Sequence, residues 1–379
     1  MKRLLIAITL LWGMVSLQAQ ENPYLKKALY FLTKLEDVDT MQIYQPDKAC
    51  FSLGLFTTGQ KAGFDVDVTF GIGSEETGRF TGLSTYKISE DYCSKLGIEI
   101  GYGNASFSYS QELGEQSAWE KNAFSFNMVG RSWGIGVDYF KITNPFISGL
   151  TVWDKDGEVI MEDEFSPKEL ATLRNFAIDG YYIFNNKRFA YPAAYKMGMV
   201  QRRTAGSWMV TARYMQGDVI NTPESALSSY DLLDCFSTMQ ASIGGGYSVN
   251  FIPWHRDPVG PRDQGLRNIN INLTAMTVLT AFNYLKTTEY EHDEGGALIG
   301  SNDSKEYCYP VPNFIANAAT SFTLDRFYLS AQFSYNRFYF RSRDAIKSNT
   351  LNIPDVVDDL SFRGFFHDWA LKGILVYRF

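Results

Sequence analysis

Hydrophobic and polar residues alternate along most of the chain after about residue 48. In NININLTAMTVLT, residues 268–280, three Asn and a Thr share one parity, while two Ile, a Leu and an Ala share the other. Residues 95–102, 133–139 and 327–336 follow the same scheme. Alternation over about ten residues, repeated about a dozen times, is typical of a transmembrane β-barrel. A soluble two-sheet sandwich also alternates and is the competing interpretation.

Two features of the alternation favour the membrane barrel. The polar faces carry little charge and many Ser, Asn, Thr and Gly residues, which suits a confined lumen better than a solvated surface. The apolar faces often end in Trp or Tyr, and aromatic residues make up 15% of the chain, with 23 Tyr and 28 Phe. Aromatic rings gather where hydrocarbon meets water. We therefore expect the Ile face of residues 268–280 to meet lipid and the Asn face to line the lumen.

Connection lengths predict the topology. Turns near residues 103, 130 and 325 are short, and outer-membrane barrels keep short turns on the periplasmic side and long loops outside. Counting strands from these turns places all of the long stretches outside. The fold class is therefore an all-β, antiparallel transmembrane barrel of about twelve strands, or fourteen if residues 62–88 contribute a hairpin. The long stretches are residues 143–171, 217–235, 283–310 and 341–368.

Both ends of the chain carry export signals. Residues 1–19 have a charged start, an apolar run and a small residue near Ala19, the pattern of a cleaved secretory signal peptide. Residues 20–47 are expected to form a periplasmic segment with a short amphipathic helix, before a barrel at 48–379. At the other end, Tyr377 and Phe379 resemble the C-terminal signal read by the barrel insertion machinery. The expected location is the Gram-negative outer membrane, with insertion machinery and outer-membrane lipid as partners.

The overall charge excludes one class of partner. The chain has 35 Lys and Arg against 42 Asp and Glu, a net charge of −7. Nucleic-acid binding needs a basic face, so no nucleic-acid partner is expected. Past the leader there is no apolar stretch of about eighteen residues, which excludes a helical membrane protein.

Glu99, Asp138, Asp179 and Arg213 lie on predicted lumen faces. They could select solutes, or they could form a salt-bridged network that fills a narrow barrel, which is the preferred interpretation.

Support for catalysis or metal binding is thin. His255, His292 and His367 each fall in a predicted connection and lack a nearby serine motif, so enzyme activity is not expected. The acidic stretch at Asp154, Asp156 and Glu158 lacks full calcium-loop spacing, so no metal or cofactor is predicted. Of the four cysteines, Cys93, Cys235 and Cys308 are expected at the outer end, where one disulfide could form, and Cys50 at the periplasmic end.

The middle of the chain resembles a known family. DGYYIFNNKRFAYPAAYKMGMVQRRTAGSWMVTARY, residues 179–214, is similar to the most recognisable stretch of the outer-membrane family named domain of unknown function 4421. DTMQIYQPDKACFSLGLF and FSFNMVGRSWGIGVDYF fit the same pattern, which covers roughly residue 38 to the end. The chain departs from it at YKISEDY. The resemblance implies a barrel and supplies no catalytic residue. The matching positions are Asn186, Arg188, Phe189, Tyr191, Ala193, Ala194, Gly206 and Ser207.

Within that stretch, residues 185–206 are expected on the periplasmic side, with Lys187, Arg188, Arg202 and Arg203 around FAYPAAY. They could fold inward and narrow the lumen, or meet an acidic periplasmic partner. The preferred interpretation is a connector whose Arg residues pair with lumen acids.

The function expected from the sequence is porin-like passage, or binding, of a small hydrophobic or lipid-like solute in a lumen lined by Ser, Asn and Thr. A filled structural barrel whose outer loops bind a partner is the alternative, and a lipid-acting barrel enzyme is the third possibility. The sequence does not identify the solute.

Overall fold

The computed structural model describes most of the chain from Asp39 onward. Among these residues no helix is long and apolar enough to cross a membrane, and the 3-10 helix η1 (Tyr191–Ala194) is the one helical element. The predicted leader, the N-terminal helix and the acidic stretch 154–158 lie outside the described residues. The described ranges are 39–44, 50–72, 80–89, 93–112, 121–130, 132–143, 146–148, 150–153, 159–163, 172–220, 235–257, 266–292, 298–342 and 357–379.

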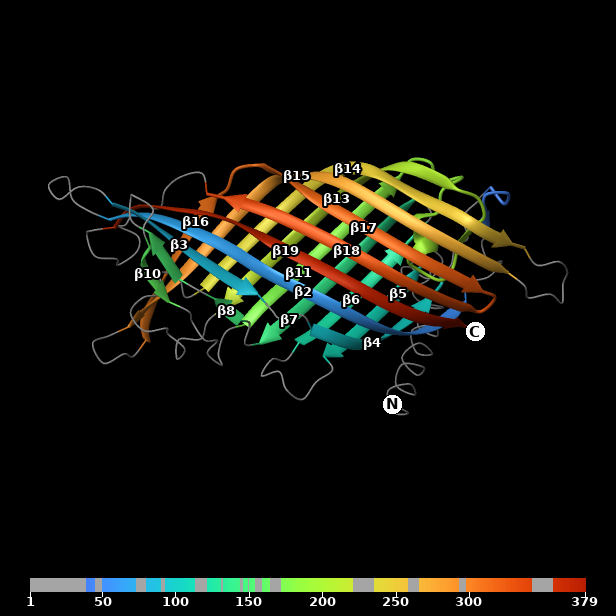
Figure 1. The fold of residues 1–379 in the computed structure, drawn as a ribbon, viewed down its shortest axis with the longest axis horizontal. Coiled ribbons are helices and arrows are strands. Elements are labelled where there is room, and N and C mark those ends of the chain that lie inside the picture. Colours follow the sequence, from blue (N-terminus) through green and yellow to red (C-terminus); the bar gives the residue numbers. More distant parts are fainter. Residues whose placement is uncertain are drawn as a thin grey trace, which may run out of the picture.

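Twelve antiparallel strands form a closed barrel, which confirms the predicted fold class and the lower strand count (Figure 1). Each strand pairs with its neighbours around the ring, and β19 pairs with β2 to close it. The ring consists, in chain order, of β2 (Phe51–Ile72), β4 (Cys93–Tyr102), β5 (Ala105–Glu112), β6 (Lys121–Val129), β7 (Trp133–Thr143), β11 (Thr172–Ile183), β13 (Ala205–Ile220), β14 (Cys235–Arg256), β15 (Arg267–His292), β17 (Val311–Leu324), β18 (Phe327–Arg341) and β19 (Val357–Arg378).

The alternation predicted from the sequence sorts the side chains between the two faces of the wall. On β15, Asn268, Asn270 and Asn272 are buried inside, whereas Leu273 and Leu279 are 57% and 49% exposed outside. Successive side chains of a strand point to opposite faces, so the exposed apolar residues of all strands form one outer band. The Ile and Leu face of this segment is therefore the outer face and the Asn face the inner one.

Large aromatic side chains gather at both ends of the outer band. One end carries Phe184, Trp208, Phe251, Trp254, Phe327 and Phe379, and the other carries Tyr109, Tyr139, Phe282, Tyr307 and Tyr339, all exposed. This distribution matches the two aromatic girdles of a barrel that crosses a bilayer.

The tightest turns all lie at one end of the barrel, although the connections 184–204 and 257–266 at that end are longer. The Gly103-Asn104, Asp325-Arg326 and 130–132 turns lie at one end, with the C-terminus, which we call the turn end (Figure 1). Gly103 and Asp325 adopt positive φ values of 55° and 50°, which a Gly or a short polar residue tolerates in a tight turn. The opposite end, called the loop end, carries the long connections. The strand parity predicted from the sequence is correct.

The long stretches are shorter as loops than expected, because several strands continue past the outer band. β2 pairs with β4 over residues 51–60 and then with β3 (Phe80–Ser89) over 63–72, so residues 62–88 form a hairpin extension and not two more ring strands. β15 likewise changes partner from β17 to β16 (Leu298–Tyr307). β8 (Phe146–Ser148), β9 (Leu150–Trp153) and β10 (Val159–Asp163) are further short strands at the loop end.

One ion pair fastens the β15–β16 extension outside the band. Lys286 Nζ lies 2.7 Å from Asp303 Oδ2, and Thr288 Oγ1 donates a hydrogen bond to Asp303 Oδ1 at 2.7 Å. The Lys286 ammonium and the Thr288 hydroxyl together lower the pKa of the exposed Asp303 carboxyl.

Candidate functional site

Residues 184–204, which connect β11 to β13, fold back into the barrel and close its turn end. We call this segment the plug. Pro192 lies near the start of η1, where a backbone N–H has no partner within the helix, so the missing N–H of proline costs no hydrogen bond. The apolar side chains of FAYPAAY are buried, which removes them from water. The fully or nearly fully buried plug residues are Phe189, Ala190, Pro192, Ala193, Ala194, Met199, Val200 and Gln201.

The polar inner face of the wall binds the backbone of the plug. A chain without regular structure needs partners for its carbonyl groups when it is buried. Five plug carbonyls accept hydrogen bonds from side chains of the wall. The pairs are Asn250 Nδ2 to Ala190 O (2.8 Å), Ser321 Oγ to Ala193 O (3.3 Å), Ser330 Oγ to Ala194 O (3.1 Å), Gln332 Nε2 to Tyr195 O (2.9 Å) and Asn268 Nδ2 to Gln201 O (2.8 Å).

Gln201 holds the two arms of the plug together. Its side chain is fully buried, its Oε1 accepts from Ala190 N at 2.8 Å, and its Nε2 donates to Arg188 O at 2.7 Å. The same Nε2 also reaches Gln42 O at 3.3 Å. One side chain therefore joins both plug arms and the segment before the barrel.

The residues before the barrel are tied to the plug. β1 (Ile43–Tyr44) pairs with β12 (Val200–Gln201), and Ile43 is buried against Ala190, Ala193 and Met199. Residues 39–44 and the plug thus form one folded unit inside the turn end.

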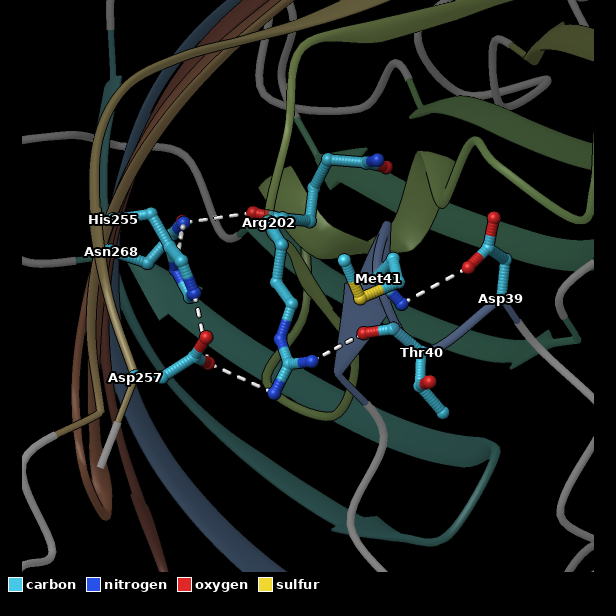
Figure 2. Close-up of polar contacts among 8 residues, drawn as sticks. Asp39, Thr40, Met41, Arg202, His255, Asp257 and Asn268 are labelled. Carbon is cyan, nitrogen blue, oxygen red and sulfur yellow. Dashed lines mark hydrogen bonds and ion pairs between the residues drawn. The ribbon is translucent and has the colours of Figure 1, made fainter. Parts of the chain in front are cut away.

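Arg202 links this unit to the wall (Figure 2). Its guanidinium donates to Thr40 O and pairs with Asp257 Oδ1 at 2.9 Å. Asp257 Oδ1 is also 3.0 Å from His255 Nε2, and His255 Nδ1 contacts Asn268 Nδ2 at 3.2 Å. We call this chain of contacts the latch. Arg202 therefore pairs with an acid at the turn end, not with a lumen acid as expected.

Above the plug the lumen widens into a cavity of about 420 Å³, which we call the chamber. Tyr191, Tyr195 and Lys196 of the plug line its turn-end side, and Tyr181 of β11 packs edge-on against Tyr191 with ring centroids 5.1 Å apart. Tyr181 lies over Gly134, where a Cβ atom would be 2.4 Å from the Tyr181 ring.

All four predicted lumen charges line this chamber. Glu99, Asp138, Asp179 and Arg213 come from β4, β7, β11 and β13 and meet at one level. Arg213 Nε lies 3.3 Å from Asp179 Oδ1, and these two residues are also register partners on adjacent strands. The sequence placed these four side chains in the lumen but could not show that they share one cavity.

Four further charged residues at the chamber were not singled out from the sequence. Lys372 Nζ pairs with Glu99 Oε2 at 3.2 Å and lies 4.1 Å from the centre of the Phe56 ring. Lys95 Nζ donates to Gln60 Oε1, and Gln60 Nε2 donates to Asp368 Oδ1, both at 2.8 Å. The fourth is Lys196. The chamber thus contains both acidic and basic side chains. The lining of Ser, Asn and Thr expected from the sequence did not include these four residues.

Arg213 also crosses the lumen. Its Nη1 donates to Asn336 Oδ1 of β18 at 3.2 Å, and its guanidinium lies 4.8 Å from the centre of the Phe338 ring. β18 and β13 are separated by three strands in the ring, so this contact braces the barrel from the inside.

The inner face toward the loop end carries large buried apolar side chains beside buried polar ones such as Gln240 and Asn283. We call it the collar. Its inward side chains are buried, which gives the lumen three levels: plug, chamber and collar. The collar residues are Phe140, Leu173, Met215, Val219, Val278, Leu285, Phe338, Phe340 and Phe366.

The family-motif residues divide between the plug and its surroundings. Phe189 is fully buried and Tyr191 faces the chamber, whereas Arg188 and Arg203 are exposed at the turn end. Asn186 stays local, with Nδ2 reaching Ile183 O at 3.4 Å. Ser207 is buried and its Oγ accepts from Asn185 N at 2.9 Å, and Gly206 lies beneath the Tyr247 ring.

Other predicted residues also have defined places. His255, His292 and His367 lie on β14, β15 and β19, so their placement in connections was wrong; the connections are shorter because these strands run on. Cys93 and Cys235 begin strands at the loop end and Cys308 follows β16 there, while Cys50 lies at the turn end. Phe379 packs on Phe51 and Tyr377, with ring centroids 5.7 and 4.9 Å away. Insertion through these last residues stays a prediction.

Two of the chamber residues outside the prediction were missed for different reasons. Asp368 lay in a presumed loop that is strand β19, and Lys196 belongs to a segment without strand periodicity. Among the described residues, no group of three or more His, Cys, Asp or Glu could hold a metal ion.

Comparisons with solved structures show low similarity. The chain is 11% identical to the outer membrane protease OmpT of Escherichia coli, with a TM-score of 0.37 over 88% of this chain and 97% of that one. It is 11% identical to the COG4313 outer membrane channel of Pseudomonas putida F1, with a TM-score of 0.24 over 91% and 100%. It is 7% identical to the P. putida toluene transporter TodX, with a TM-score of 0.21 over 88% and 91%. No curated protein sequence matches the chain.

A family assignment comes from the sequence itself. The profile described as domain of unknown function (DUF4421) matches residues 79–356, which is more than half of the chain. The matched region includes the plug, most of the ring and the chamber residues Glu99, Asp138, Asp179 and Arg213. It is narrower than the expected span from residue 38 to the end, and leaves DTMQIYQPDKACFSLGLF outside. The chain therefore belongs to the DUF4421 family.

Proposed function

We propose that this protein is an outer-membrane barrel that admits a small solute from the loop end and holds it in the chamber above the plug. Passage beyond the chamber requires the plug to move. One observation carries the proposal: the plug closes the turn end while a cavity of about 420 Å³ with charged and aromatic lining remains above it. Convergent polar groups around a cavity of a few hundred Å³ are typical of a ligand site.

The outer-membrane location rests on the wall. Its even strand number, apolar outer band and two aromatic girdles fit a bilayer and no other solvent. The partners we propose are outer-membrane lipid around the band, the insertion machinery at the C-terminal strand, and a periplasmic protein at the exposed Arg188 and Arg203 of the turn end.

A filled structural barrel is the second candidate, and two observations favour it. The plug carbonyls are bound by the wall, and Arg213 crosses the lumen to Asn336. Such a barrel would hold its shape for outer loops that bind a partner. It differs from the solute barrel in having no continuous path from the loop end to the plug.

An enzyme is not part of the proposal. Both ring nitrogens of His255 are engaged, by Asp257 and Asn268, which leaves neither available as a general base for a nucleophile. Loss of wild-type lipid hydrolysis on changing the three histidines would contradict this.

Conductance in planar bilayers tests the solute barrel against the filled barrel. The full-length protein is compared with a variant whose residues 188–203 are replaced by a short Gly-Ser turn. We expect the wild type to stay closed and the variant to form stable channels, because in this proposal the plug is what blocks the lumen. An Arg203→Gln variant, changed at an exposed plug residue, is the control and should stay closed.

Each other outcome has a defined meaning. Stable wild-type channels would show that the plug does not close the barrel. A silent plug variant that still shifts on an SDS gel after boiling would show a folded barrel with a filled lumen, and the second candidate would replace the first.

A further inference from the structure

Asp138 and Lys196 face the chamber without an ion-pair partner among the described residues, unlike their neighbours. Asp179 pairs with Arg213, and Glu99 pairs with Lys372. Asp138 stands opposite Ser125 of β6 and within hydrogen-bonding reach of its hydroxyl. Lys196 Nζ is 3.4 Å from the backbone carbonyl of Asn127. The hydrogen-bond partners of both charged groups are thus neutral.

The strand β6 sets the spacing of these two charges. Ser125 and Asn127 are two residues apart on the same face of this strand, a separation of roughly 7 Å. Asp138 and Lys196 therefore approach β6 at positions two residues apart on this strand, and both line the chamber. A small group bound beside this part of β6 can reach both.

Each charge has neighbours of its own sign, and the nearby opposite charge is already engaged elsewhere. Asp179 and Asp368 lie close enough to Asp138 to act on it, and Arg213, the one nearby base, is already engaged by Asp179 and Asn336. Lys372 acts in the same way on Lys196, and Glu99, the nearby acid, is already paired with Lys372. Acids therefore outnumber bases around Asp138, and two bases share one acid around Lys196.

A charge shielded from water is unfavourable unless a counter-charge or strong hydrogen bonds offset the loss of hydration. A ligand that carries both signs would satisfy Asp138 and Lys196 together. A ligand of one sign would satisfy one of them and oppose the other. The rings of Tyr191 and Tyr195 next to Lys196 offer apolar contact for the remainder of the ligand.

We propose that the chamber binds a small zwitterion, with its ammonium at Asp138 and its carboxylate at Lys196. This assignment rests on the proposed solute-binding function and names the class of solute. It differs from the hydrophobic or lipid-like solute expected from the sequence, because several charged side chains are among the groups that line the chamber.

Titration calorimetry on the full-length protein in detergent tests the assignment with three probes of one size: leucine, isopentylamine, which lacks the carboxylate, and 4-methylpentanoate, which lacks the ammonium. We expect leucine to bind at least tenfold more tightly than either analogue. Asp138→Asn should lower leucine affinity to that of 4-methylpentanoate. Lys196→Met should lower it to that of isopentylamine.

Matched controls keep the result specific. Asp303→Asn and Lys305→Gln remove the same charges from the exposed β16 extension and should leave leucine affinity unchanged. Asp138→Glu keeps the charge and should retain most of the preference, which separates loss of the carboxylate from loss of folding. The boiling-dependent gel shift of each variant verifies the barrel.

The failures of the two proposals are distinguishable. Equal affinity for all three probes, or leucine binding that survives both Asp138→Asn and Lys196→Met, would overturn the zwitterion assignment and leave a solute chamber. If no probe binds but the plug variant conducts, the zwitterion assignment is overturned and the solute barrel stands. A plug variant that stays silent would overturn the solute barrel itself.

Discussion

The wall groups that bind the plug and the charged wall groups of the chamber differ in chemistry and lie on different strands. Where the plug enters, the wall presents Asn250, Asn268, Ser321 and Ser330, and these amides and hydroxyls bind plug carbonyls. Where no chain enters, the wall presents carboxylates, amines and a guanidinium. Neutral amides and hydroxyls suit the plug backbone, which is a permanent partner, since these hydrogen bonds form on folding and are then kept.

Charged groups suit a partner that comes and goes. They lose part of their hydration in the chamber and gain strong hydrogen bonds when a ligand of opposite charge arrives. The difference between the two regions therefore separates a structural half of the lumen from a half that can be emptied and filled. The variants below test that division, in order of expected effect.

Gln201→Leu should have the largest effect, because it removes the side chain that joins both plug arms. Ala190 N and Arg188 O would lose buried partners, at about 1–3 kcal/mol each. We expect the plug to leave the lumen and stable channels to appear in planar bilayers. Gln111→Leu, on the exposed face of β5, is the matched control and should remain closed. A closed Gln201→Leu barrel would mean that apolar packing alone holds the plug.

Arg213→Met should destabilise the barrel without opening the turn end. It removes the bonds to Asp179 and Asn336 and leaves a carboxylate in the chamber without its base, a loss of about 2 kcal/mol. The temperature at which the barrel loses its resistance to SDS should fall by several degrees. Arg203→Met removes an exposed guanidinium and should leave that temperature unchanged. An unaltered Arg213→Met barrel would show that the lumen needs no internal brace.

Gly134→Ala tests the packing of the chamber wall. A Cβ atom at this position would lie 2.4 Å from the Tyr181 ring, so the ring must shift, at a cost of about 1 kcal/mol in the free energy of unfolding. Gly180→Ala on the adjacent strand is the matched control, since its nearest atoms are 3.9 Å away. A small fall in the same melting temperature is expected for the first variant and none for the second.

Arg202→Gln should have the smallest effect on stability. The pair with Asp257 is half exposed, with 50% of the Asp257 side chain accessible, and exposed pairs contribute about 0.2–1 kcal/mol. The change should instead be local. Residues 39–44 lose the hydrogen bond from Arg202 to Thr40 O, so a protease that reaches the turn end should cleave them several times faster. Arg188→Gln is the control. Equal cleavage rates would show that the β1–β12 pairing suffices.

The sequence predicted the wall because lipid lies on its outer side and a polar lumen on its inner side. Apolar and polar residues must therefore alternate along each strand. Inside the bilayer a residue such as Leu273 must face lipid and Asn272 must not, so parity alone assigns the faces. Beyond the bilayer that constraint ends, and strands such as β16, LIGSNDSKEY, read as loops. The ring size was therefore predictable, while the strand ends, and with them Asp368 and His367, were not.

The chamber was predictable only in part, for a different reason. Parity places Asp179 and Arg213 on the inner face, but their pairing depends on the register between β11 and β13. The plug separates these two strands in the sequence, so the sequence does not fix that register. Lys196 comes from a segment that follows neither a strand nor a helix period. The apolar stretch FAYPAAY was the signal that this segment is buried. An inward fold was one of the interpretations of it, but the charged residues around it led us to prefer a connector.

The seam between β2 and β19 has a consequence for the order of assembly. It joins the first and last strands of the ring, from Ser52 with Arg378 to Ile72 with Val357, so the ring cannot close until the C-terminus has been made. The plug precedes most of the later strands in the chain, and the wall residues that bind it lie on β14, β15, β17 and β18. Docking of the plug and completion of the wall therefore depend on each other, and until the ring closes β2 has an unpaired edge that needs protection from other chains.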